Sequence, residues 1–349
     1  MQLSIPQSAR AQLEFNAALS AARARGSQPA LLQAYAAAAE RFVAVHGHAP
    51  TSLAEVESVV LDLPAFQADW ALAATIAERM WRELTTLVEL NEASVDQQVR
   101  GIADQALGEL RLNPGLREPA YYATSAFHLA PGNYSGSYVY AINNDSELTP
   151  VVTRRSWPGV RQIFQRSIPH GEYGCIVDLG AGLGRSTVAL KELFPAASVI
   201  GVDLAERELR YAHWESERRG LAITYLQADA THTPLPAGSA DLVVAYILHH
   251  ELPPPAMQAL LGEAFRLLRP GGWFMNGDVT PNRHMLPLTR YLLGRQVQTG
   301  AEPYWLVAGD MDLPVEFRAA GFEDIREQAP PDHPHGLHFP WWTAGQKPQ

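Results

Sequence analysis

Cysteine is nearly absent from this sequence of 349 residues, in which Cys175 is the only one. A single thiol cannot form an intramolecular disulfide, and no cysteine cluster is available to hold a structural zinc ion. The sequence also lacks a positively charged N-terminal segment followed by an apolar core, and no apolar run approaches the roughly 18 residues of a membrane span. We therefore expect a cytoplasmic protein with no membrane partner.

Positive charge is also scarce, because 27 lysines and arginines stand against 37 aspartates and glutamates, which gives a formal net charge of −10. The densest basic feature is the pair Arg154–Arg155. A protein that follows a phosphate backbone needs a broad basic surface, so this balance argues against nucleic acid as a partner or substrate. Hydrophobic residues make up 47% of the chain, which is enough apolar material for a buried core.

The chain divides into parts with different periodicity. Residues 1–125 are rich in helix formers with apolar residues at helical spacing, which predicts an all-helical N-terminal domain whose last helix is Val95–Leu112. Within it, Ser52 and Glu55 have the spacing of a capping box. Residues 126–170 form a turn-rich bridging segment of a composition that suits a loop over a cleft. The role of the helical part is open between a structural bundle, a cover for the substrate and a dimer element.

Residues 171–349 repeat a pattern of strand, turn and helix. Such alternation predicts a parallel sheet with helices on both faces, and ligands of such sheets bind at the carboxyl ends of the strands. The apolar runs that predict the first five strands are Cys175–Leu179, Val199–Val202, Ile223–Gln227, Leu242–Tyr246 and Trp273–Asn276.

A glycine-rich turn, Asp178-Leu179-Gly180-Ala181-Gly182-Leu183-Gly184, follows the first of these strands. Glycines keep such a turn tight and let the backbone approach a ligand closely. The dinucleotide pattern G-x-G-x-x-G would need a glycine where Arg185 stands, so that pattern fails. Asp203, at the end of the next strand, can accept hydrogen bonds from both ribose hydroxyls of an adenosine, and Asp178 can contact a positively charged amino group.

This arrangement resembles the class I S-adenosylmethionine-dependent methyltransferase family, with specific motifs over about residues 170–280. The likeness continues loosely through Ala319–Ile325 and His338–Thr343, which would be the sixth and seventh strands. It implies a Rossmann-like sheet of seven strands whose last pair is antiparallel, with S-adenosylmethionine as the cofactor. The residues that it implies for cofactor binding are Asp178, Gly180, Ala181, Gly182, Gly184, Asp203, Leu204, Asp229, Ala230 and Tyr246.

The segment His249-His250-Glu251 follows the fourth predicted strand, and in the family this loop commonly faces the methyl acceptor. A neutral histidine there can take a proton from a hydroxyl, an amine or an acidic carbon. The same histidines could instead cap or pack, with Glu251 orienting one of them. Adjacent residues on an extended chain point to opposite faces, so we expect no metal site here. A solvated turn is the expectation for His333, His335 and His338 as well.

Further candidate contacts to the acceptor are polar or aromatic residues near the expected cleft: Tyr134, Tyr138, Tyr140, Asp278 and Trp305. The tyrosines could equally pack between the two halves, and residues 282–311 could wall the acceptor site or form a homodimer contact. The expected function is S-adenosylmethionine-dependent methyl transfer to a small aromatic or apolar molecule, as in secondary metabolism. The alternatives are a protein or peptide methyltransferase and a non-catalytic S-adenosylmethionine-binding partner.

Overall fold

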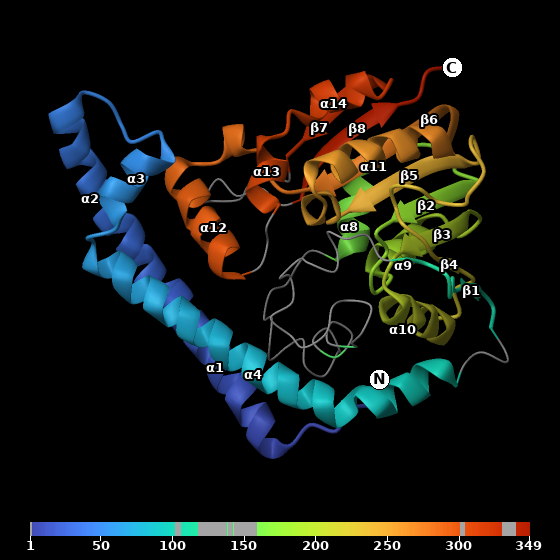
Figure 1. Cartoon of the computed structure of the whole chain (residues 1–349), viewed down its shortest axis with the longest axis horizontal. Coiled ribbons are helices and arrows are strands. Elements are labelled where there is room, and N and C mark those ends of the chain that lie inside the picture. The colour runs from blue at the N-terminus through green and yellow to red at the C-terminus, as the bar shows by residue number, and fades with distance from the viewer. Residues whose placement is uncertain are drawn as a thin grey trace.

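The computed structural model describes residues 2–101, 106–117, 159–300, 304–329 and 340–349, together with Tyr138 and Ile142. Residues 296–300 are described by their backbone alone. The chain forms an α/β domain around one mixed sheet, and a long helical arm built from N-terminal residues runs alongside it (Figure 1). The predicted order of a helical part followed by an α/β part is therefore confirmed.

In the part of the chain that the structure describes, eight strands lie in one sheet in the order β1-β4-β3-β2-β5-β6-β8-β7. Neighbouring strands are parallel except at β8, which pairs antiparallel with both β6 and β7. This confirms a Rossmann-like sheet with an antiparallel last pair, and the buried central strands explain the apolar runs in the sequence. The bounds of the strands are β1 Glu109–Arg111, β2 Cys175–Leu179, β3 Ser198–Asp203, β4 Thr224–Gln227, β5 Ala240–Tyr246, β6 Leu268–Asp278, β7 Glu323–Gln328 and β8 Trp341–Gln346.

The sheet has one strand more than the seven that the sequence predicts, and the additional strand is β1. The sequence predicts a helix over Val95–Leu112, whereas the last arm helix ends at Arg100 and Glu109–Arg111 pairs in parallel with β4. The open edge of β4 offers backbone hydrogen bonds to this segment. These bonds stabilise the strand more than the helical spacing of its apolar residues stabilises a helix. The Glu217 carboxylate also accepts the N–H groups of residues 107 and 108, each at 2.7 Å. The N-terminal part is therefore not entirely helical.

Helices cover both faces of the sheet, and each face has its own apolar core. On one face lie α8 (Val160–Ser167), α9 (Arg185–Leu193) and α10 (Glu206–Arg218). On the other face lie α11 (Pro254–Leu267) and α14 (Leu313–Ala319). Four short or inserted elements adjoin the carboxyl ends of β5 and β6: η2 (His249–Glu251), η3 (Asn282–His284), α12 (Pro287–Gly300) and α13 (Trp305–Asp310).

Four helices make up the arm: α1 (Gln7–Arg25), α2 (Ser27–His46), α3 (Leu53–Val60) and α4 (Pro64–Arg100). Ser52 and Glu55 form the predicted capping box at the start of α3. Helix α1 packs along α4, and Arg23 makes a bidentate ion pair with the buried Asp69, with N–O distances of 3.0 and 2.7 Å. Within the described ranges no single helix is long and apolar enough to cross a membrane, and only the bent pair α3 and α4 taken together meets that length and composition.

The arm contacts the α/β domain at two separate places. Toward one end, Tyr211 and Trp214 of α10 pack into the apolar core that α1 and α4 share. Toward the other end, Leu288 and Tyr291 of α12 pack against α3 and the start of α4. The carboxyl end of β5 points toward the arm (Figure 1). The arm therefore faces the carboxyl ends of the strands, which form the edge of the sheet where ligands of such folds bind.

Candidate functional site

The turn between β2 and α9 depends on glycine at three alternate positions. Gly180, Gly182 and Gly184 have φ angles of 78°, 47° and 76°, in the left-handed region that glycine adopts readily. The N–H groups of Gly180 and Ala181 donate to the Val202 carbonyl at 2.8 and 2.9 Å, which ties the turn to β3. A Cβ atom on Gly182 would have no neighbour within 4 Å, so the turn is open to close approach by a ligand.

Gly184→Ala is expected to lower the free energy of unfolding by about 2–4 kcal/mol. An added methyl group would lie 2.5 Å from the Tyr225 hydroxyl and 2.8 Å from Cβ of Ala212, in addition to the strained φ. Gly220→Ala is the matched control, because Gly220 has a φ of 69° with open space around it. It should cost only about 1 kcal/mol in urea denaturation. Equal losses of unfolding free energy in the two variants would show that the contacts of the added methyl group with Tyr225 and Ala212 cost nothing.

Asp178 has a buried carboxyl group near the end of β2, and one of its two oxygens accepts hydrogen bonds. Its Oδ2 accepts hydrogen bonds from the Ser186 and Thr187 hydroxyls at 2.7 and 2.6 Å. Its Oδ1 is also buried and has no hydrogen-bond partner among the described residues. Burial raises the pKa of this carboxyl to about 7. A buried acceptor without a donor is costly, so this oxygen fits a cationic donor such as the amino group of S-adenosylmethionine.

Asp203 lies at the end of β3, directly beside the glycine turn. Its Oδ2 accepts the N–H of Gly182 at 2.7 Å, and its Oδ1 accepts the N–H of Ala205 at 2.9 Å. A carboxylate offers about four lone-pair sites, so two remain for ribose hydroxyls. Burial raises the pKa of Asp203, and the neighbouring Glu251 carboxylate raises it further. The end of η2 therefore lies within electrostatic reach of the expected ribose position.

The remaining predicted cofactor residues lie at the ends of β3, β4 and β5. Asp229 accepts the N–H and the hydroxyl of Thr231 at 2.8 and 2.7 Å, next to the buried Ala230. Leu204 accepts a hydrogen bond from a β4 side chain through its carbonyl oxygen, and Tyr246 stacks on Trp342 with ring centroids 5.9 Å apart. Because β4, β3, β2 and β5 are adjacent, the sheet brings the predicted cofactor residues to one edge. Together with the unpaired oxygen of Asp178, this set fits S-adenosylmethionine.

The histidine segment forms the single turn η2, so the expectation of an extended chain there is wrong. Asp278, at the end of β6, accepts the backbone N–H of His249 through Oδ2 at 2.6 Å. Its Oδ1 pairs with Nδ1 of His250 at 2.7 Å, and Nε2 of His250 lies 3.5 Å from the Glu251 carboxylate. Ile247, with a φ of 60°, turns the chain out of β5 before this contact. A carboxylate on the neighbouring strand therefore fixes the turn and one imidazole.

The two histidines have opposite electrostatic surroundings. Burial opposes a charge on His250, but the Asp278 carboxylate, helped by Glu251, holds its pKa well above the usual value. Burial lowers the pKa of His249 to about 4. Both ring nitrogens of His249 are buried without a hydrogen-bond partner in the described part of the chain. At neutral pH the cluster is thus an ion pair, His250 with Asp278, beside a buried neutral imidazole without a hydrogen-bond partner among the described residues.

Lowering the pH from 7 to 5 is expected to destabilise the protein through His249. The folded pKa of about 4 lies below the usual 6.5, so the unfolded chain binds the proton first and stability falls as the pH drops below 6.5. The expected loss at pH 5 is about 2 kcal/mol. His249→Phe should remove this component, which comparison of urea denaturation of both proteins at pH 7 and 5 measures. An unchanged pH dependence in the variant would contradict the assignment.

The structure brings two candidate acceptor contacts to the histidine cluster and places a third elsewhere. Asp278 holds η2, and the half-buried Trp305 ring has its centroid 4.8 Å from that of His250. Tyr138 is fully buried between the arm and α10, where its hydroxyl donates to Asp96 at 2.7 Å and its ring stacks under Arg207. The other two candidate tyrosines, Tyr134 and Tyr140, lie outside the described residues.

Two charged residues near the expected cofactor position were not predicted. Arg185 directly follows the last glycine, and partial loss of hydration lowers the pKa of its guanidinium, which Tyr211 and Tyr246 oppose. Glu208, in the first turn of α10, is buried close to Asp203, and burial raises its pKa well above the usual value. The position of Arg185 after the turn was a usable signal. Nothing in the charged sequence of α10 marks Glu208 as buried.

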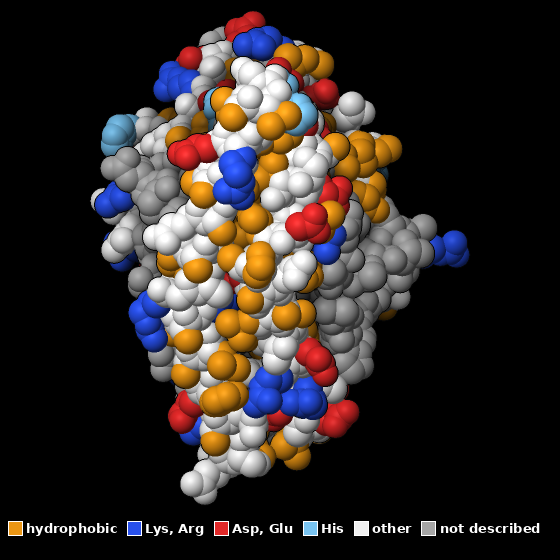
Figure 2. All heavy atoms as spheres, turned by 90° about the vertical axis from the view of Figure 1, so that its left-hand side faces the viewer, with side chains coloured by type: hydrophobic (Ala, Val, Ile, Leu, Met, Phe, Trp, Pro, Cys, Tyr) orange, Lys and Arg blue, Asp and Glu red, His pale blue; other side chains and the backbone are white. Residues whose placement is uncertain are grey.

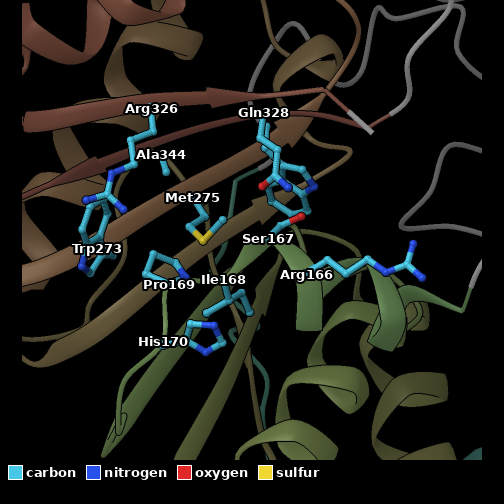
Figure 3. Close-up of a pocket in the computed structure, with 11 residues that line it drawn as sticks. Arg166, Ser167, Ile168, Pro169, His170, Trp273, Met275, Arg326, Gln328 and Ala344 are labelled. Atoms are coloured by element: carbon cyan, nitrogen blue, oxygen red, sulfur yellow. The ribbon is translucent and has the colours of Figure 1, made fainter. Parts of the chain in front are cut away.

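A cavity of 440 Å³ lies on the sheet face that α8 covers, between the end of α8 and strands β6, β8 and β7 (Figure 3). Met275 and Ala344 lie at its centre, with Arg326 stacked on Trp273 at one side and Gln328 at the other, where it pairs with Trp342 in the strand register. None of the predicted site residues that the structure describes lines it, and it is distinct from the cofactor residues at the strand ends.

Within the ranges that the structure describes, no group of three or more His, Cys, Asp or Glu side chains is arranged to hold a metal ion. His333, His335 and His338 lie outside those ranges.

Residues 176–272 match the family model for a methyltransferase domain. The chain is 38% identical over 97 residues to demethylmenaquinone methyltransferase of Thermus thermophilus, which covers 28% of this chain and 43% of that protein. It is 40% identical over 106 residues to trans-aconitate 2-methyltransferase of Azoarcus sp., which covers 30% and 39%. Among solved structures, Haemonchus contortus phosphoethanolamine N-methyltransferase 2 in complex with S-adenosyl-L-methionine is similar with a TM-score of 0.43 and 19% identity, over 55% of this chain and 53% of that one.

The chain spans less than half the length of these curated relatives. The matched region begins in β2, contains the glycine turn with Asp178 and Asp203, and ends in β6. Residues 176–272 therefore form a class I S-adenosylmethionine-dependent methyltransferase domain, whose cofactor is S-adenosylmethionine.

Proposed function

We propose that this protein transfers a methyl group to a small aromatic or apolar molecule that loses a proton at the reacting atom. The observation that carries the proposal is the unpaired, neutral His249 beside the His250–Asp278 ion pair, at the edge where the cofactor residues meet. When bound, S-adenosylmethionine supplies a methyl group that is already electrophilic. The protein's own contribution is then to orient the acceptor and to remove its proton.

Each member of the cluster has a distinct part in this proposal. His249 accepts the proton from the acceptor, because its ring nitrogens have no other partner among the described residues. Asp278 is a positioning residue that holds the backbone of His249 and keeps His250 charged. The charge on His250 stabilises negative charge that develops on the acceptor as its proton leaves.

The surroundings of the cluster favour a small acceptor over a peptide. Trp305 offers an aromatic surface next to His250, and α13 carries it against η2. The arm meets the domain on two sides of this edge, through α10 and through α12. A site bordered on two sides suits an enclosed pocket of the kind that takes small molecules, whereas a peptide needs an open groove.

The test is an assay for S-adenosylhomocysteine release from purified full-length protein with a panel of small phenols, carboxylic acids and enols, and with a peptide library. Turnover with members of the small-molecule panel, lost in His249→Ala and retained when the exposed His232 is replaced by Ala, supports the proposal. Turnover on peptides alone would assign a protein methyltransferase. Tight cofactor binding without any turnover would assign a non-catalytic binding protein.

A further inference from the structure

Helices α1 and α2 follow one another along the outer side of the arm, joined by the single residue Gly26 (Figure 1). Of the 20 residues of α2, only Leu31 and Ala38 are buried. Helices of this length owe most of their stability in water to the packing of an apolar face. α2 has a second apolar face that is largely exposed and includes Leu32 and Val43.

The second face has the spacing of a coiled-coil seam. Ten positions from α1 into α2 follow one another at alternating intervals of four and three residues. We call this set the seam, and its members are Ala11, Phe15, Ala18, Ala22, Arg25, Pro29, Leu32, Ala36, Ala39 and Val43. All are exposed except Ala39, which is half-buried, and all but Arg25 are apolar. Gly26, with φ −119° and ψ −77°, separates the two helices of this rod. Such spacing keeps one stripe directed at a partner helix.

The outer face of the arm shows this apolar character directly. Figure 2 shows hydrophobic side chains running down the length of the face, between scattered charged groups. Phe15 is 52% exposed, Leu32 is 42% exposed and Val43 is 40% exposed, which is unusual for large apolar residues at regular spacing. The seam itself carries one charge in ten positions, so it offers little to a basic, acidic or nucleic-acid partner.

The seam is complementary to itself when two copies run antiparallel. Placing Ala22 opposite Leu32 fixes the register, and the same register places Phe15 opposite Ala39 and Val43 opposite Ala11. Large side chains then face small ones at these positions, and close packing of helices requires such alternation. Arg25 falls opposite Pro29 instead of its own copy. In a parallel pair every residue would meet itself, which would bring two Arg25 charges together.

We propose that the seam is a dimer interface, and that two copies of this chain associate through an antiparallel, two-fold pairing of their α1–α2 rods. A two-fold contact uses the same patch on both subunits, as the self-complementary register requires. This inference is independent of the proposed methyl transfer, because it rests on the arm alone.

The first test is the molar mass of the full chain by light scattering coupled to size exclusion, at about 50 μM. The wild type should have the mass of a dimer, and Phe15→Glu or Leu32→Glu should give a monomer with unchanged helical circular dichroism. Leu90→Glu is the matched control, because Leu90 is 51% exposed on the same arm but lies outside the seam, and this variant should remain dimeric. A monomeric wild type, or loss of the dimer only in the control, would overturn the proposal.

The second test fixes the direction of the pairing without destabilising the arm. In a Cys175→Ser background, the double variant Ala18→Cys with Ala36→Cys should form disulfide-linked dimers under mild oxidation, because these positions oppose each other across the antiparallel seam. Each single variant should remain uncrosslinked, because neither position meets its own copy. Efficient crosslinking of the single variants, or none in the double variant, would rule out the antiparallel register.

Discussion

Asp203→Ala is expected to weaken the binding of S-adenosylmethionine and of S-adenosylhomocysteine by at least about 100-fold. The Asp203 carboxylate lies at the end of β3 with two lone-pair sites unused by Gly182 and Ala205, and these are the acceptors available to two ribose hydroxyls. A hydrogen bond to a charged group contributes about 1.5–3 kcal/mol, so losing two accounts for the expected change. The substitution also removes the acceptor for the N–H of Gly182, which loosens the glycine turn.

Isothermal calorimetry with both ligands measures this effect. Asp203→Asn keeps one acceptor and should fall between the wild type and the alanine variant. Asp62→Ala removes an exposed carboxylate from the arm and controls for the change in net charge, so it should bind as the wild type does. Unchanged affinity in Asp203→Ala, or binding of NAD in preference to S-adenosylmethionine, would contradict the role given to Asp203.

The parts of the fold that the sequence predicts are those in which local pattern and tertiary packing agree. The parallel strands are buried on both faces, so their residues form apolar runs, and Asp178 and Asp203 fall at strand ends whose position the runs define. β1 is the counterexample, because its spacing is compatible with a helix and only the edge of β4 and the Glu217 side chain place it in the sheet. That information lies more than 100 residues further along the chain.

The candidate site also combines features that have a local sequence signal with features that depend on residues distant in the sequence. The glycine turn, Asp203 and the two histidines each have a local signal in the sequence. The contact between Asp278 and His250 joins residues 28 positions apart through adjacent strands, and it decides which histidine is charged and which is neutral. Sequence alone therefore predicts the members of the cluster, whereas their division of roles follows from the sheet order.

His249→Ala is expected to lower kcat by about 100- to 10,000-fold, with the affinity for S-adenosylmethionine nearly unchanged. His249 is the neutral imidazole of the cluster, and it makes no hydrogen bond among the described residues that would keep it from an acceptor. Removing it leaves the His250–Asp278 ion pair intact, because Asp278 contacts only the backbone N–H of residue 249. The turn should therefore keep its geometry, and the loss should appear in the chemical step.

A purely structural role for His249 makes a different prediction. It would lower stability and cofactor affinity together, and His249→Gln, which is close in size and polar, would restore activity. If His249 takes the proton, His249→Gln should remain as slow as the alanine variant, because an amide cannot act as the base. The wild-type rate should also fall as the pH is lowered toward about 4, where His249 becomes protonated, and the variants should lack this dependence. Stopped assays of product formation across that pH range, with an acceptor identified in the panel, separate the two roles.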